Sequence, residues 1–151
     1  MSLDTFPDES VELPRALLVA GLVLRDKKVL LLENIKQEKR IEPLGGKVKD
    51  GEDPVGALVR EGIEEIGREI QPLGFLGTFP TCSSEGEFDV HTYVCALSGE
   101  PKQGCEPGKT GHIDWYDWKG VCDLMRKAEQ GELTIVPNLR AIMPLLEKLL
   151  A

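Results

Sequence analysis

The chain has 151 residues, 41% of them hydrophobic and 29% charged, and a formal net charge of −8 at pH 7. This length is enough to bury a core, and the composition is globular rather than disordered. The negative charge argues against broad nucleic-acid binding, which needs a basic surface, although a bound cation could bring phosphate to an acidic site. The longest apolar run, residues 16–24, is too short to span a membrane, so we expect no membrane partner.

The chain begins with MSLDTFPDES, an acidic and polar stretch without the basic and apolar regions of a signal peptide. We therefore expect a cytoplasmic protein. Residues 1–12 are expected to form a flexible segment, and residues 1–151 a single domain. The cysteines contain no C-x-x-C pair and are expected to be reduced thiols: Cys82, Cys95, Cys105 and Cys122.

Two apolar runs rich in branched residues come first. ALLVAGLVL (16–24) and KVLLLENI (28–35) flank the polar RDKK and predict two strands joined by a turn. IEPLGGKVKDGED (41–53) combines glycines, a proline and charges, which predicts a loop.

The helix predicted after this loop has clear start and stop signals. Asp53 suits the N-cap, and Pro54 suits the first helical position because its missing N–H would have no partner there. Gly67 can adopt a left-handed conformation and end the helix. An apolar stripe is predicted to face a sheet: Val55, Leu58, Val59, Gly62, Ile63 and Ile66. The acidic residues would then lie on the opposite, exposed face.

Further strands and helices are predicted downstream. Strands are expected at 72–79, 88–97 and 112–118, and helices near 121–130 and at 138–150. Pro144 should kink the last helix or move its start. This mixed order of strands and helices favours an α/β sandwich with a mixed sheet.

Glu61, Glu64 and Glu65 fall within about a third of a turn of one another on the predicted helix, where like charges repel. A solvated acidic face is the ordinary explanation for such a group. Here, however, Gly45 and Gly46 precede the helix and allow the backbone to bring a carbonyl close. Mg²⁺ prefers carboxylate and carbonyl oxygens. The pattern therefore favours a metal site.

The spacing G-x5-E-x7-R-E-x-x-E-E-x-G is present in full, in Gly46, Glu52, Arg60, Glu61, Glu64, Glu65 and Gly67. In this motif the chain resembles the Nudix hydrolases. The resemblance implies an α/β/α sandwich with a mixed sheet and hydrolysis of a nucleoside diphosphate linked to another group. Gly62 and Arg68 depart from the pattern, because the family favours apolar residues there, and Leu44 stands where many members have proline.

The resemblance also implies roles for the residues of the motif. Glu61, Glu64 and Glu65 would hold Mg²⁺, with Mn²⁺ as an alternative, together with the carbonyl of Gly45. We expect Glu65 to deprotonate the attacking water, although another of these glutamates or an acid outside the motif could do so. Arg60 is expected to orient the glutamates through hydrogen bonds.

Residues outside the motif bear on the substrate. Lys47 either meets a phosphate or is a solvated loop lysine. Asn138 lies in IVPNLRAIMPLL, which resembles the segment where MutT-type enzymes recognise a purine, but an asparagine after proline is also a common helix cap. Many family members add an acid after the motif, for which Glu106 is the nearest candidate, followed by Glu85 and Glu87.

The expected substrate is a purine (d)NTP, oxidised or unmodified, cleaved to NMP and pyrophosphate. ADP-ribose, a nucleotide sugar or a dinucleoside polyphosphate are the alternatives. A non-catalytic nucleotide-binding module and a plain acidic interaction domain also remain open, but a module without catalysis can lose these glutamates, and here all are present. The expected partner is a small-molecule nucleotide, and a homodimer is left open.

Overall fold

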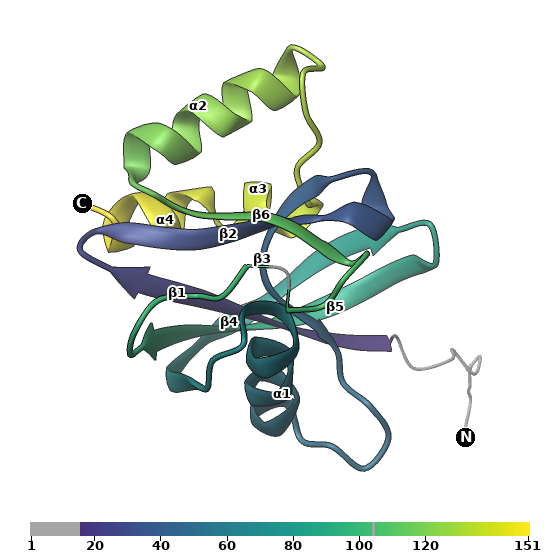
Figure 1. Ribbon diagram of the computed structural model, residues 1–151. Coiled ribbons are helices and arrows are strands. Elements are labelled where there is room, and N and C mark those ends of the chain that lie inside the picture. Colours follow the sequence, from purple (N-terminus) through teal and green to yellow (C-terminus); the bar gives the residue numbers. More distant parts are fainter. Residues whose placement is uncertain (1–15, 104) are drawn as a thin grey trace, which may run out of the picture.

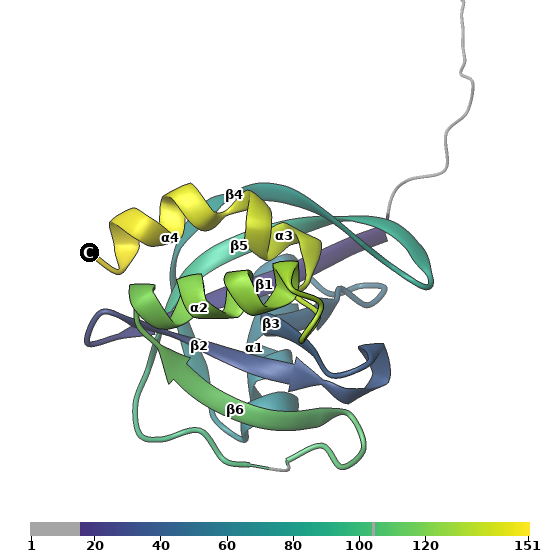
Figure 2. The same cartoon turned by 90° about the horizontal axis from the view of Figure 1, so that it is seen from above.

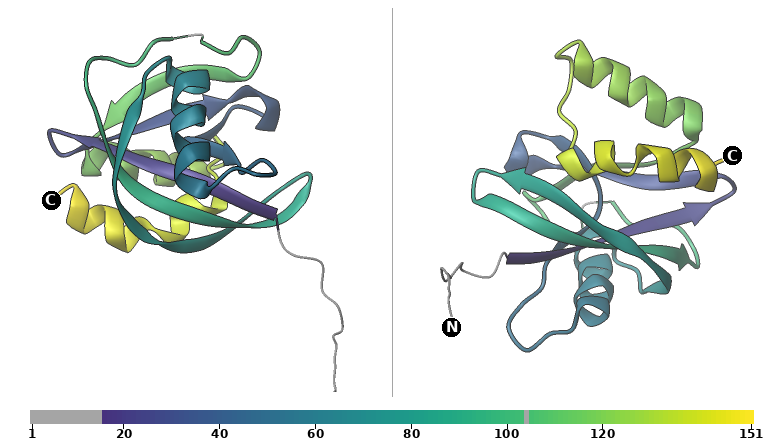
Figure 3. Two further views of the ribbon diagram at one scale, coloured as in Figure 1. Left: turned by 90° about the horizontal axis from the view of Figure 1, so that it is seen from below. Right: turned by 180° about the vertical axis from the view of Figure 1, so that it is seen from behind.

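The computed structural model describes residues 16–103 and 105–151, and in this part of the chain six strands form a mixed sheet covered by helices on both faces (Figure 1). Helix α1 covers one face, and α2, α3 and α4 cover the other (Figure 3). The predicted α/β/α sandwich is therefore confirmed. The segment 1–12 lies outside the described residues. No helix among the described residues is long and apolar enough to cross a membrane.

The strands are β1 (Ala16–Arg25), β2 (Lys28–Asn34), β3 (Arg40–Lys47), β4 (Ile70–Ser83), β5 (Gly86–Leu97) and β6 (Thr110–Tyr116). Their order in the sheet is β4-β5-β1-β3-β2-β6, and a short 3-10 helix, Ile35–Gln37, separates β2 from β3. β1 and β5 run parallel, whereas the other neighbours are antiparallel. All the strands predicted from the apolar runs are present.

Strand β3 corrects the sequence prediction, which placed a loop over residues 41–53. Gly45 pairs with Ala20 of β1, and Pro43 lies opposite Leu31 of β2. Backbone pairing on both sides thus outweighs the low strand propensity of glycine and proline. A Cβ at Gly45 would collide with the carbonyl of Val19, so glycine permits this close approach.

Alternation along buried strands divides the core into two layers. In β2, Val29 and Leu31 face the helices near the C-terminus, while Leu30 and Leu32 face the α1 side. All four side chains are at most 2% exposed. A continuous apolar run is therefore needed here, because both faces of this strand are covered.

Helix α1 (Pro54–Ile66) begins and ends as predicted. The Asp53 side chain accepts a hydrogen bond from the Gly56 N–H at 2.6 Å. Gly67 ends the helix with a φ of 64° and donates its N–H to the Ile63 carbonyl.

The predicted buried face of α1 is partly wrong. Val55 and Ile63 are 43% and 54% exposed, whereas Glu61 and Glu65 are each only 3% exposed. Gly62 helps to explain this rotation, because a Cβ there would lie 3.1 Å from the Arg68 carbonyl oxygen and 3.3 Å from the Ile70 side chain. The glycine lets the helix pack closely on the sheet and turns the acidic residues inward.

Three helices cover the opposite face: α2 (Trp118–Glu129), α3 (Pro137–Ala141) and α4 (Met143–Leu149) (Figure 2). Asp117 caps α2 by accepting from the Gly120 N–H at 2.8 Å. Pro144 was predicted to kink the last helix or to move its start. It stands in the first turn of α4 and marks the start of this helix, which is the second of the two predicted outcomes. All four cysteines are free thiols, as expected.

Candidate active site

The acidic residues of α1 face a cavity of about 470 Å³. Strands β1 and β3, the turn between β4 and β5, the segment before β6 and the start of α3 line it as well. Such a volume is within the range of small-molecule sites. The sheet and helix therefore bring the motif and the C-terminal part of the chain to one cavity.

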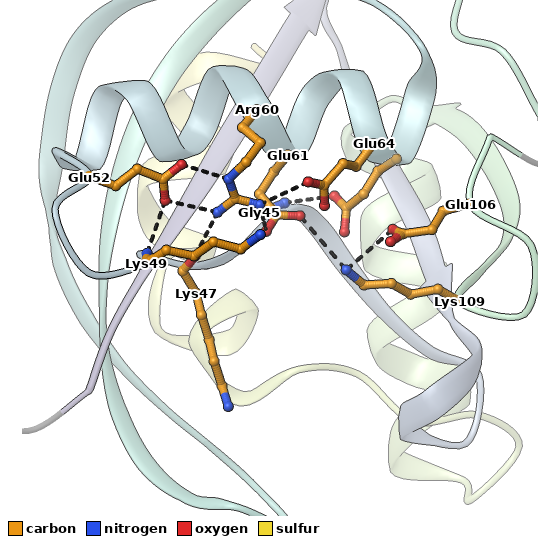
Figure 4. Close-up of polar contacts among 10 residues, drawn as sticks. Gly45, Lys47, Lys49, Glu52, Arg60, Glu61, Glu64, Glu106 and Lys109 are labelled. Atoms are coloured by element: carbon orange, nitrogen blue, oxygen red, sulfur yellow. Dashed lines mark hydrogen bonds and ion pairs between the residues drawn. The ribbon is translucent and has the colours of Figure 1, made fainter.

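Arg60 joins three glutamates at one end of this cavity (Figure 4). Its Nε and Nη2 donate to Glu52 at 2.6 and 3.0 Å, and its Nη1 donates to Glu61 at 3.0 Å and Glu64 at 3.1 Å. Nη2 also donates to the Lys47 carbonyl at 2.9 Å. The Arg60 hydrogen bonds lower the pKa of Glu52 to about 2, with a smaller contribution from the Lys49 N–H. Arg60 thus bonds to three glutamates of the motif at once.

Two acids of the site, Glu61 and Glu65, are buried. Glu65 Oε1 accepts a hydrogen bond from the Gly45 N–H at 3.0 Å. Burial, and then the charge of Glu61, raise the pKa of Glu65 well above its usual value. Burial also raises the pKa of Glu61, although the charges of Lys109 and Arg60 oppose this. Both carboxylates would be stabilised as anions by a further cation.

The Glu61 carboxylate is suited to such a cation. Its Oε1 is buried and accepts no hydrogen bond from the described residues. No group of three or more acidic, histidine or cysteine side chains forms a ready metal cluster in the described ranges, since Arg60 and Lys109 pair with the carboxylates instead. The donor set is nevertheless hard and anionic, as Mg²⁺ and Mn²⁺ require.

Gly46 packs directly against Glu61. A Cβ at this position would collide with Glu61 Oε2, the oxygen that Arg60 holds at 3.0 Å. Since the carboxylate is buried and bonded, it has little room to move.

We expect Gly46→Ala to displace Glu61, to lower the free energy of unfolding by about 1–3 kcal/mol and to reduce turnover. Melting curves and initial rates measure these effects. Gly51→Ala is the control, because a Cβ at Gly51 would meet no atom within 4 Å. The φ of 81° at Gly51 adds some backbone strain to this variant. Unchanged stability and turnover in Gly46→Ala would contradict the packing argument.

Two substrate-binding candidates line the cavity in different ways. Lys47 points away from the motif glutamates and is 57% exposed, with an ion pair to Glu85 (Figure 4). Asn138 is 3% exposed. The helix-cap interpretation of Asn138 is wrong, because Val136 occupies the N-cap of α3 and no side-chain cap bond is present.

Sequence analysis missed a polar network in this cavity. Glu42 accepts hydrogen bonds from Asn34 Nδ2 at 2.8 Å and Arg40 Nη2 at 3.1 Å, and the buried hydroxyl of Thr81 has no hydrogen-bond partner among the described residues. Arg40 and Glu42 are two residues apart on β3 and therefore share a face. That signal was hidden because Glu42 lies in the segment 41–53, which was predicted as a loop.

Lys109 was also missed. It precedes β6, and its Nζ lies 3.2 Å from Glu106 Oε1 and 3.9 Å from Glu61 Oε1. Of the acids considered outside the motif, Glu106 and Glu85 line the cavity.

The chain belongs to the NUDIX domain family, whose model matches residues 14–139. Nudix hydrolases generally use a divalent metal and act on small-molecule nucleotides. The prediction of a hydrolase that acts on phosphoric anhydride bonds is confirmed by this membership.

Solved structures share the fold. A MutT protein from Methanosarcina mazei Go1 is 18% identical with a TM-score of 0.71, over 91% of this chain and 96% of that one. A NUDIX-family hydrolase from Clostridium perfringens is 22% identical with a TM-score of 0.68, over 92% and 100%. An ADP-ribose pyrophosphatase from Streptococcus suis is 14% identical with a TM-score of 0.58, over 70% and 76%. At these identities the likeness establishes the fold, and substrate choice depends on this chain's own cavity.

Proposed function

We propose that the protein is a Mg²⁺-dependent pyrophosphohydrolase of purine (d)NTPs, oxidised or unmodified, which yields NMP and pyrophosphate. The observation that carries the proposal is that one cavity contains both the buried motif glutamates and the buried Asn138. A triphosphate could then lie with its phosphates near α1 and its base near α3.

Glu61, Glu64 and Glu65, with the Gly45 carbonyl, would hold the Mg²⁺, and Mn²⁺ would fit the same oxygen donors. When bound, the ion would neutralise phosphate charge and acidify a water molecule. Glu65 would accept the proton of that water, since burial raises its pKa and makes it a stronger base than an exposed carboxylate. Arg60 would keep Glu61 and Glu64 in place.

Asn138 would read the base edge. Its amide supplies both donors and an acceptor, and it makes no side-chain capping bond at the start of α3. Lys47 would leave Glu85, an exposed and therefore weak partner, to meet a phosphate.

We expect Asn138→Ala to reduce discrimination between purine and pyrimidine triphosphates by about 1–3 kcal/mol, because the base edge loses its partner. The measurement is the ratio of kcat/KM for dGTP to that for dCTP in wild type and variant, with melting curves beside it. Asn34→Ala removes a second amide side chain from the same cavity, and its kcat/KM ratio is compared with that of Asn138→Ala. An unchanged ratio in Asn138→Ala would contradict base recognition.

A nucleotide panel tests the proposed substrate class directly. Purine and pyrimidine triphosphates, 8-oxo-dGTP, ADP-ribose, a nucleotide sugar and a dinucleoside polyphosphate are incubated with Mg²⁺, and the products are separated by chromatography. The proposal requires the highest kcat/KM for a purine triphosphate. Faster cleavage of ADP-ribose or a nucleotide sugar would contradict the proposed substrate and identify that compound as the better one. Binding without cleavage would indicate a non-catalytic module.

A further inference from the structure

Lys109 is held firmly at the edge of the acidic cluster. The Lys109 carbonyl accepts from the Ile35 N–H at 2.8 Å, and the Lys109 and Thr110 N–H groups donate to the Glu106 carbonyl at 3.2 and 3.4 Å. These bonds fix the backbone on both sides of the residue. The side chain then extends toward α1 and brings its ammonium group between Glu106 and Glu61 (Figure 4).

The two oxygens of Glu61 have different surroundings. Arg60 donates a hydrogen bond to Oε2 at 3.0 Å, whereas buried Oε1 accepts none from the described residues. The ammonium of Lys109 lies 3.9 Å from Oε1, too far for a hydrogen bond but close enough for a strong charge interaction in a partly buried site. The Lys109 side chain is 26% exposed and the Glu61 side chain 4%, so solvent screens this pair only in part.

Lys109 also acts on the site as a whole. Burial raises the pKa of Glu61, Glu65 and Glu42, and the positive charge of Lys109 counteracts that increase at each of the three. Arg60 is engaged by Glu52, Glu61 and Glu64, and it approaches from the other side of the Glu61 carboxylate. The cation on the Oε1 side of Glu61 is therefore the ammonium of Lys109.

We propose that Lys109 is a tethered counter-cation, which balances Glu61 and Glu106 in the metal-free protein and gives way when a divalent cation binds Glu61. This inference rests on the proposed function in that it takes Glu61 as a metal ligand. Two consequences follow from the charge of Lys109. It stabilises the buried carboxylates before metal binds, and it weakens metal binding by competing for Glu61 and by repelling a second cation nearby.

The test is calorimetric titration of Mn²⁺ into the nucleotide-free protein, with melting curves in chelator. Lys109→Met should lower the Mn²⁺ Kd about tenfold, because competition and repulsion are both removed, and should lower the melting temperature of the metal-free protein. Lys109→Gln, which keeps a polar end, should behave in the same way. Lys109→Arg keeps the charge and should restore a Kd close to that of the wild type.

Lys36→Met is the matched control. Lys36 lines the same cavity but has no ion pair with the described residues, so its removal changes the net charge equally and should leave the Kd unchanged. An unchanged Kd in Lys109→Met and Lys109→Gln would overturn the inference, as would an equal change in Lys36→Met. If wild type binds no Mn²⁺, or binds it equally well after Glu61→Gln, the metal site of the proposed function fails instead.

Discussion

Glu65→Gln is expected to reduce kcat about 100- to 10,000-fold, the range typical for loss of a general base. The same substitution is expected to raise the melting temperature of the metal-free protein. The glutamine carbonyl can still accept the Gly45 N–H at the position of Oε1, but it brings no charge into a site where Glu65 is 3% exposed. The substitution should therefore lower kcat while it raises the free energy of unfolding of the metal-free protein by about 1–2 kcal/mol.

The sign of the pH dependence follows from the same burial. Burial, and then the charge of Glu61, raise the pKa of Glu65 in the folded protein above its value in the unfolded chain, so the ionised form of Glu65 lowers stability. The loss of stability is complete at pH values above the pKa of Glu65 in the folded protein. It disappears as pH falls to the pKa of Glu65 in the unfolded chain. Metal-free wild type should thus become more stable as pH falls from above the raised folded pKa of Glu65 toward its unfolded pKa, and Glu65→Gln should show a smaller gain.

Melting curves at several pH values in chelator, with initial rates in Mg²⁺, measure these effects. Glu69→Gln is a control on the segment after α1, because Glu69 is exposed and does not line the cavity. A Glu65→Gln protein with near-normal kcat would exclude Glu65 as the base. A Glu65→Gln protein that melts lower than wild type in chelator would contradict the cost assigned to its charge.

Removal of divalent ions is expected to abolish turnover. The motif carboxylates are paired with Arg60 and Lys109 in the metal-free arrangement, and neither basic residue supplies an activated water. Rates are measured after treatment with excess chelator and again after Mg²⁺ or Mn²⁺ is restored. Full activity in chelator would contradict the proposed chemistry.

Metal should also stabilise the folded protein. A ligand that binds only the folded state, at 100 times its Kd, contributes about 2.7 kcal/mol. The increase in melting temperature should grow as pH rises, because deprotonation of the buried glutamates favours metal binding, and it should be reduced in Glu61→Gln. The absence of any increase in wild type would count against binding at these residues.

Local signals in the sequence predicted the ends of α1 and the start of α4. Asp53, Gly67 and Pro144 act through backbone geometry and bonds to near neighbours, so their effects are readable without the rest of the fold. β3 was not predicted, because Pro43 and Gly45 are stabilised in a strand by pairing with distant segments. Non-local pairing overrode local propensity here.

The motif predicted which residues of α1 gather in the cavity but not how they are surrounded. Helical spacing alone placed Glu61 and Glu65 on an exposed face, whereas close packing at Gly62 turns them inward. The interpretations of Asn138 could be separated only once the N-cap of α3 was known to be Val136. Lys109 lies 48 positions after Glu61, too far along the chain for spacing to connect them.

Phosphorus NMR of dGTP incubated with the protein, with and without Mg²⁺, tests directly whether the protein is a pyrophosphohydrolase. We expect dGMP and pyrophosphate to appear together, only when the metal is present, and Glu65→Gln to yield neither at a comparable rate. Release of dGDP and orthophosphate, or an unchanged dGTP spectrum at high protein concentration with Mg²⁺, would contradict it.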